Sequence, residues 1–156
     1  MASTDRADRL SLAVGAGLLA LYIAQAVLGL QVPALVRLQH DERYKVITGC
    51  VLAAYLLHQS LMARRRIFAP VGVVLWHKLA GACAPLLLYL HASRFAYGYL
   101  FLLSMLFLGT VGLALLHRVS LRARTLYAWW FVLHIVTAST LVVLSGYHAV
   151  IALAYR

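Results

Sequence analysis

Five long runs of apolar residues are the feature that most limits how this chain can fold. They cover residues 10–32, 46–62, 71–92, 97–117 and 126–155. Each run is long enough to cross the ~30 Å hydrocarbon core of a bilayer as a helix, the second being the shortest. The 156-residue chain is 64% hydrophobic, and its mean hydropathy is +0.88. We therefore expect an all-α membrane protein, with five transmembrane helices bundled into a single domain over residues 1–156.

The formal net charge of +10 comes from basic residues that flank the apolar runs. In that position they act as topology signals, so the charge does not indicate a nucleic-acid partner. If the N-terminus is cytoplasmic, the basic residues of that side are Arg6, Arg9, Arg64, Arg65, Arg66, Lys78, Arg118, Arg122 and Arg124. Those of the other side are Arg37, Arg43, Lys45, Arg94 and Arg156. The excess predicts a multi-pass protein of a bacterial-type inner (plasma) membrane with its N-terminus inside and with lipid as its surroundings.

Four histidines form two matched pairs inside two of these runs. His77 and His91 lie in the third run, His134 and His148 lie in the fifth, and each pair is 14 residues apart. In a helix this spacing puts both side chains on one face, ~21 Å apart. Imidazole is costly to place in lipid and is a good axial ligand for haem iron. Because the third and fifth spans run parallel, the pairs can meet in register, one pair near each membrane surface.

The expected cofactors are therefore two b-type haems, the first held by His77 and His134 and the second by His91 and His148. An iron with two imidazole ligands has no open position, which favours electron transfer. Small or basic residues nearby are candidate haem contacts, since glycine permits close approach and cations neutralise propionates. They are Lys78, Gly81, Arg94, Arg122, Arg124 and Gly146, with Arg66 as a further cation. Generic helix packing is the alternative for the glycines, and hydrogen bonding between helices is the alternative for the histidines.

The remaining polar residues in or near the runs narrow the function. All four acidic residues, Asp5, Asp8, Asp41 and Glu42, lie outside the runs, unlike the membrane-depth carboxylates of ion-coupled transporters. No C-x-x-C-H motif is present, and we interpret Cys50 and Cys83 as buried core residues. His58, within the second run, is open to interhelical hydrogen bonding, a quinone or propionate contact, or ligation. Pro85, between His77 and His91, predicts a kink.

The H-x13-H pattern on two spans separated by a ligand-free span resembles the ferric-reductase-type membrane domain. The stretch W-H-K-L-A-G around His77 is similar to that family's H-K-x-x-G, and the run R-x-x-x-x-Y-x-x-W-x-x-x-H ends at His134. The likeness covers about residues 64–156, and a related layout occurs in cytochrome b561-type proteins. It implies that the first histidines of the two helices share the inner haem and the second ones share the outer haem.

These observations predict a dihaem b-type cytochrome that carries electrons across the membrane as the electron-transfer subunit of a transmembrane oxidoreductase. The expected donor is a cytoplasmic flavin reductase or a membrane quinol, because the chain has no G-x-G-x-x-G nucleotide-binding motif. The expected acceptor is a redox protein or small acceptor on the outer side. One alternative is a quinone-coupled membrane-anchor cytochrome b of a larger complex. The other is a non-redox, histidine-bearing scaffold or transporter.

Overall fold

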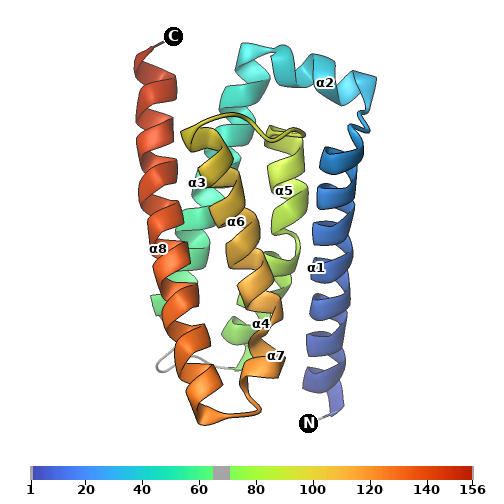
Figure 1. Cartoon of the computed structure of the whole chain (residues 1–156), viewed down its shortest axis with the longest axis vertical. Helices are drawn as coiled ribbons and strands as arrows, with labels where there is room; N and C mark the ends of the chain where they lie inside the picture. The colour runs from blue at the N-terminus through green and yellow to red at the C-terminus, as the bar shows by residue number, and fades with distance from the viewer. Residues whose placement is uncertain (1, 65–70, 156) are drawn as a thin grey trace. The chain divides into compact units, whose positions relative to one another are not determined.

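The computed structural model describes residues 2–64 and 71–155, and these residues form helices without any strand. The helices group into two compact units, one ending at Arg94 and one beginning at Phe95 (Figure 1). The first unit contains α1 (Ala2–Leu28), α2 (Pro33–His40), α3 (Glu42–Arg64), α4 (Val71–Ala82) and α5 (Ala84–His91). The second contains α6 (Tyr99–Leu115), α7 (His117–Ser120) and α8 (Arg124–Ala154).

Four helical stretches of the described chain are long and apolar enough to cross a membrane. They are Arg6–Leu28, Glu42–Ala63, Gly72–His91 and Arg124–Ala154. The fourth expected span forms α6, which has 17 residues and is therefore ~25 Å long, shorter than a full hydrocarbon core. The five expected spans thus become four of full length and one shorter apolar helix. The second expected span does not form the shortest helix of the five, because α3 extends beyond the apolar run to 23 residues.

The surfaces of these helices are those of a protein surrounded by lipid. None of the most apolar window of α3 is buried within the chain, and Ile47 and Leu57 on it are 63% and 58% exposed. Exposed apolar area costs roughly 25 cal/mol per Å² in water, a cost that hydrocarbon removes. The apolar composition and the exposed apolar side chains therefore agree on a membrane environment.

The first helix ends earlier than its apolar run, and a short helix follows it. Gly29 adopts a φ of +67°, and the N–H of Leu30 donates to the carbonyl of Gln25 at 3.0 Å. This is a Schellman-type end, which glycine adopts without a steric penalty. The helix α2 then begins at Pro33, a residue suited to a first helical position. The sequence analysis did not predict α2, because the apolar run up to Val32 obscured the turn.

The third span is interrupted between its two histidines. Proline has no N–H to continue a helix, and Pro85 is fully buried at the second position of α5. The Cys83 N–H donates to the Ala80 carbonyl and the Leu86 N–H donates to the Cys83 carbonyl, both at 3.1 Å. These tight turns separate α4 from α5, so the predicted kink is confirmed as a break at Cys83.

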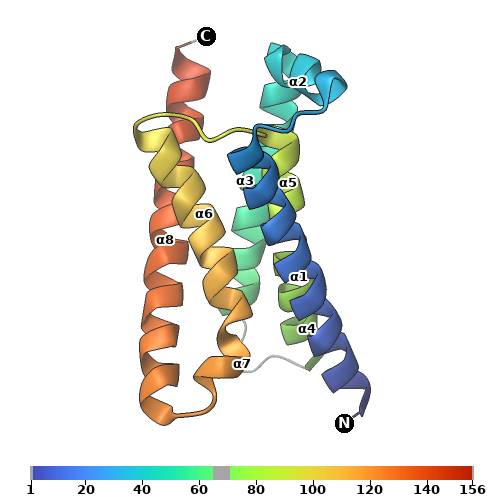
Figure 2. The same cartoon turned by 45° about the vertical axis from the view of Figure 1, so that its right-hand side comes forward.

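Within the first unit, α1 and α3 both pack against the interrupted helix α4–α5, as Figure 2 shows. Within the second, α6 and α8 lie side by side in opposite directions and are joined through α7 (Figures 1 and 2). The indole Nε1 of buried Trp130 donates to the Leu113 carbonyl at 2.6 Å, which ties α8 to the end of α6. Spanning helices thus carry all four histidines of the expected pairs.

The two cysteines provide a test of membrane insertion. Cys50 and Cys83 are free and exposed, so the prediction that they are buried in the core is wrong. Because they lie within spans, lipid should shield them from a charged, membrane-impermeant maleimide in intact membranes. Both should react with it after the membranes are dissolved in detergent. A cysteine placed at exposed Arg94, just after α5, is the positive control; labelling of Cys50 in intact membranes would contradict the insertion of α3.

Candidate functional site

The four paired histidines are divided equally between the two units. His77 lies in α4 and His91 ends α5, while His134 and His148 both lie on α8. Within the first unit, His77 is near the start of α1, and His91 is near the start of α3. Within the second, His134 lies one helical turn from Trp130, whose indole bonds Leu113 near the end of α6, and His148 lies beside Tyr99 at the beginning of α6. Each unit by itself therefore carries two of the four paired imidazoles at separate positions along its helices.

His91 is held against α3 by two neighbouring residues. The Thr48 hydroxyl oxygen lies 3.1 Å from His91 Nδ1. At Gly49 a methyl group would lie only 3.2 Å from His91 Cε1, so the ring packs directly on the backbone of α3. The absence of a side chain at Gly49 is what permits this approach. Neither residue was identified from the sequence, because the apolar run does not show which face of α3 packs against His91.

Side chains from α1 and α2 hydrogen-bond the last carbonyls of the helix that ends in His91. The Gln39 amide donates to the carbonyls of Tyr89 and Leu90 at 2.8 and 3.2 Å. The Ser93 hydroxyl in turn donates to Gln39 Oε1 at 2.6 Å. The carbonyls that follow the helix are bonded from α1, by Tyr22 OH to Ala92 at 3.0 Å and Gln25 Nε2 to Ser93 at 2.7 Å. The end of α5 is therefore anchored on both neighbouring helices, which limits the movement of His91.

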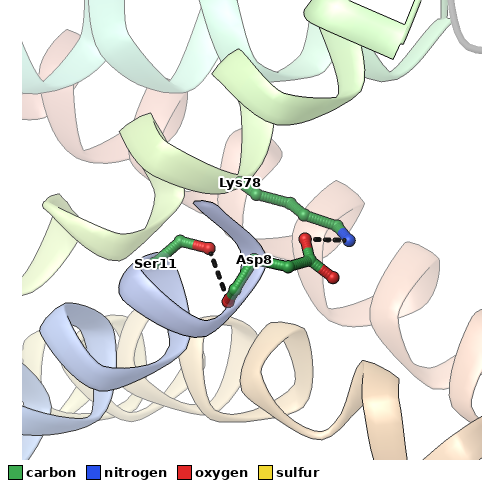
Figure 3. A network of polar contacts seen from close by, with 3 residues as sticks. All are labelled: Asp8, Ser11 and Lys78. Carbon is green, nitrogen blue, oxygen red and sulfur yellow. Dashed lines mark hydrogen bonds and ion pairs between the residues drawn. The ribbon is translucent and has the colours of Figure 1, made fainter. Parts of the chain in front are cut away.

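The neighbourhood of His77 contains an ion pair that the sequence analysis did not predict. Figure 3 shows Lys78 Nζ and Asp8 Oδ1, which are 2.7 Å apart, with about a quarter of each side chain exposed. Ser11 donates its hydroxyl to the Asp8 carbonyl at 3.1 Å. Asp8 lies in the candidate stretch Arg6–Leu28 and Glu42 begins the candidate stretch Glu42–Ala63, so two acidic residues expected outside the spans belong to helices that could cross a membrane. The ammonium of Lys78, expected to face a propionate, has a carboxylate partner from α1.

His134 is stacked on an aromatic cluster within the second unit. Its ring lies parallel to that of Trp130, with 5.5 Å between the centroids and 9° between the planes. Trp130 also contacts His117, at 4.8 Å, and Tyr127, at 5.5 Å. Since the Trp130 indole is fixed by its bond to Leu113, the stack fixes the plane of the His134 ring as well.

A hydroxyl group lies next to Nδ1 of His148, as another does next to Nδ1 of His91. Tyr99 OH lies 3.2 Å from His148 Nδ1, and the Tyr99 ring also meets Tyr147 edge to face at 6.1 Å. In both cases a hydroxyl at Nδ1 leaves Nε2 as the nitrogen best placed to bind a metal, a common arrangement for ligating histidines. Polar residues in apolar spans were the signal that would have identified Thr48; nothing in the sequence singles out Tyr99 among nine tyrosines.

The other expected contacts are open or exposed. A methyl group at Gly81 or Gly146 would meet nothing within 4 Å. Arg94, Arg122 and Arg124 are exposed. Arg65 and Arg66 lie outside the described residues, as do the side chains of Arg64 and Arg118. The roles of these residues toward a haem stay predictions.

The three histidines outside the two matched pairs, His40, His58 and His117, differ in their surroundings. His40 is exposed and lies 2.7 Å from the Val36 carbonyl through its Nδ1. The ring of His117 contacts that of Trp130. His58 is exposed on α3, and among the described residues no hydrogen bond joins it to another helix.

The side chains that could ligate a metal suit a cofactor whose metal already has other ligands. Within residues 2–64 and 71–155, no three His, Cys, Asp or Glu side chains gather closely enough to hold a bare metal ion. The available donors are single imidazoles on apolar helices. A haem supplies four nitrogen ligands and needs only two from the protein, so the residues fit it.

Compared with protein-family models, with curated proteins and with solved structures, the chain matches none of them.

Loss of the bonds at the end of α5 should destabilise the first unit. Gln39→Ala leaves the Tyr89 and Leu90 carbonyls without their amide donor, at a cost of about 1–3 kcal/mol in unfolding free energy. Reversible denaturation in mixed micelles measures it. Gln31→Ala, between α1 and α2, is the matched control and should change stability little. Equal stability of the two variants would show that the amide of Gln39 contributes nothing there.

Substitutions at Gly81 and Gly146 can distinguish a role in helix packing from contact with a haem. Gly81→Ala and Gly146→Ala fill open space in helices, so the haem-free protein should gain about 0.5–1 kcal/mol of stability from each. If a macrocycle lies against these positions, both variants should bind less haem per chain than the wild type. Gly17→Ala, also in open space, should leave haem binding unchanged. Full haem content in all three variants would assign Gly81 and Gly146 to generic helix packing.

Proposed function

We propose that this chain is a dihaem b-type cytochrome that carries electrons across a membrane. In this proposal it has five transmembrane helices, a cytoplasmic N-terminus and a place in a bacterial-type inner membrane. The donor is a cytoplasmic flavin reductase or a quinol, and the acceptor is a redox protein or small acceptor outside. The likeness of the spans around His77 and His134 to the ferric-reductase-type domain supports this assignment.

The observation that most supports this proposal is the placement of four imidazoles on helices long enough to span a membrane. Two of them lie in the span Gly72–His91 and two in the span Arg124–Ala154. Polar side chains in spans are costly and are typical of functional sites. The rings of His91, His134 and His148 are held by contacts with Thr48, Trp130 and Tyr99 respectively. Rings fixed in this way are suited to act as ligands whose orientation must not change with each electron.

The proposed ligand pairs are those expected from the sequence. His77 and His134 hold the inner haem, and His91 and His148 hold the outer one. A haem with two imidazole ligands supplies one-electron transfer without an open coordination position. Arg94 is a candidate to bind propionates at the outer end, and Arg122 and Arg124 are candidates at the inner end. These last two, exposed beside α8, also suit the docking of an acidic flavoprotein by electrostatic steering.

A quinone-coupled cytochrome b is the second candidate, and the exposure of His58 favours it. This imidazole lies on the lipid-exposed helix α3, where a quinone dissolved in the membrane can reach it. Reduction of the haems by quinol without a flavoprotein, abolished in His58→Leu, would select this candidate over the first.

The deciding experiment is a reduced-minus-oxidised absorption spectrum of the protein purified in detergent, with haem measured per chain. Two b-type haems per chain are expected. His77→Ala and His134→Ala should each remove the same haem, while His91→Ala and His148→Ala should remove the other. His40→Ala, at an exposed position on α2, is the control and should retain both.

The possible results separate the candidates. Haem that survives all four substitutions would show that these histidines are not its ligands. If His77→Ala and His148→Ala removed the same haem, the proposed pairing would be wrong. A colourless protein from cells supplied with haem would refute electron transfer and favour the non-redox scaffold or transporter.

A further inference from the structure

We infer that Thr48 is a positioning residue that selects the nitrogen through which His91 binds its haem. Thr48 lies on α3, outside the region that resembles the ferric-reductase-type domain, and no role follows for it from that likeness. The inference rests on the proposed function for the haem, but the hydrogen bond that carries it lies entirely within the first unit.

The direction of the hydrogen bond follows from the proton of the Thr48 hydroxyl. Its oxygen lies 2.9 Å from the Tyr44 carbonyl and 3.2 Å from the Lys45 carbonyl. A carbonyl only accepts, so the single hydroxyl proton must go to one of these two oxygens. If it pointed at His91 instead, two oxygen atoms would face each other at 2.9 Å with no proton between them.

With its proton directed to the α3 backbone, Thr48 has only lone pairs to offer His91. The 3.1 Å contact with His91 Nδ1 is therefore satisfied when Nδ1 carries the proton and donates it. A neutral imidazole has one N–H and one lone pair, so the lone pair then lies on Nε2. Thr48 thus holds His91 as the tautomer that ligates iron through Nε2.

The neighbouring glycine keeps the ring at this distance. A methyl group at Gly49 would come within 3.2 Å of His91 Cε1 and 3.8 Å of Nδ1. The ring edge that carries Nδ1 therefore rests against α3, one residue along from the hydroxyl. Together the hydroxyl and the space at Gly49 fix both the position and the tautomer of the ring.

A bound haem would report this hydrogen bond through its reduction potential. Donation from Nδ1–H increases the electron density at Nε2, and this stabilises ferric iron relative to ferrous iron. The bond from Thr48 to the Tyr44 carbonyl strengthens the hydroxyl as an acceptor, because chained hydrogen bonds polarise one another. Removal of the hydroxyl should therefore raise the potential of the haem at His91.

The experiment compares Thr48→Val, which removes the hydroxyl, with Thr48→Ser, which keeps it. Each haem is followed by redox titration of the purified protein. The tautomer of His91 is read from ¹⁵N chemical shifts in the haem-free chain, with His91→Gln used to assign the signal. Thr110→Val is the matched control, because Thr110 on α6 makes the same bond to the carbonyl four residues back, at 2.7 Å.

In Thr48→Val we expect the potential of one haem to rise, or that haem to be lost, and a larger share of His91 to carry its proton on Nε2. Thr48→Ser should restore wild-type values, and Thr110→Val should not differ from the wild type. Two haems with unchanged potentials and an unchanged tautomer in Thr48→Val would overturn the inference while leaving the proposed function intact. A wild-type chain without haem would refute the proposed function, and the tautomer would still decide the role of Thr48.

Discussion

The hydrogen bonding of backbone carbonyls where a helix stops inside a membrane protein is the constraint on which this structure depends. The C-terminal end of each helix leaves four carbonyls without an intrahelical partner, and hydrocarbon offers no water to replace it. The break at Cys83 and the end of α5 at His91 both create such ends within one span. The chain meets the second with Gln39, Gln25 and Tyr22, contributed by α2 and α1. The position of His91 is therefore a product of helices that carry no ligand.

Three of the imidazoles also have well-defined neighbours. His91 and His148 share their Nδ1 atoms with hydroxyls, and His134 is stacked on an indole that is itself hydrogen-bonded. Such contacts offset the cost of polar groups in an apolar environment. They also hold the rings in one orientation, which reduces the rearrangement that accompanies a change of charge. The contacts that offset the cost of these polar side chains in the membrane thus also fix the orientation of their rings.

The sequence predicted the helices well and their ends poorly. The apolar runs located every spanning helix, because length and hydropathy are sufficient for that. The end of α1 depended on the backbone of Gly29, and the first residues of α1 are polar, so Asp8 was placed outside the helix. For the same reason Lys78 was assigned to a propionate, although Asp8 lies 2.7 Å away. Thr48 and His91 are 43 positions apart, and their contact depends on which face of α3 packs on α5. The sequence of α3 alone does not reveal that face.

The interruption of the third span makes the positions of its two histidines less dependent on each other. On α8, His134 and His148 stand on one continuous rod of 31 residues, so a rotation or shift at one is passed to the other. On the other span, His77 and His91 stand on separate segments of 12 and 8 residues, each with its own contacts. A substitution near His77 can adjust one end without disturbing the other. In the span that contains Pro85, the surroundings of His77 and of His91 can therefore change separately. A shift of the continuous helix α8 affects both of its histidines.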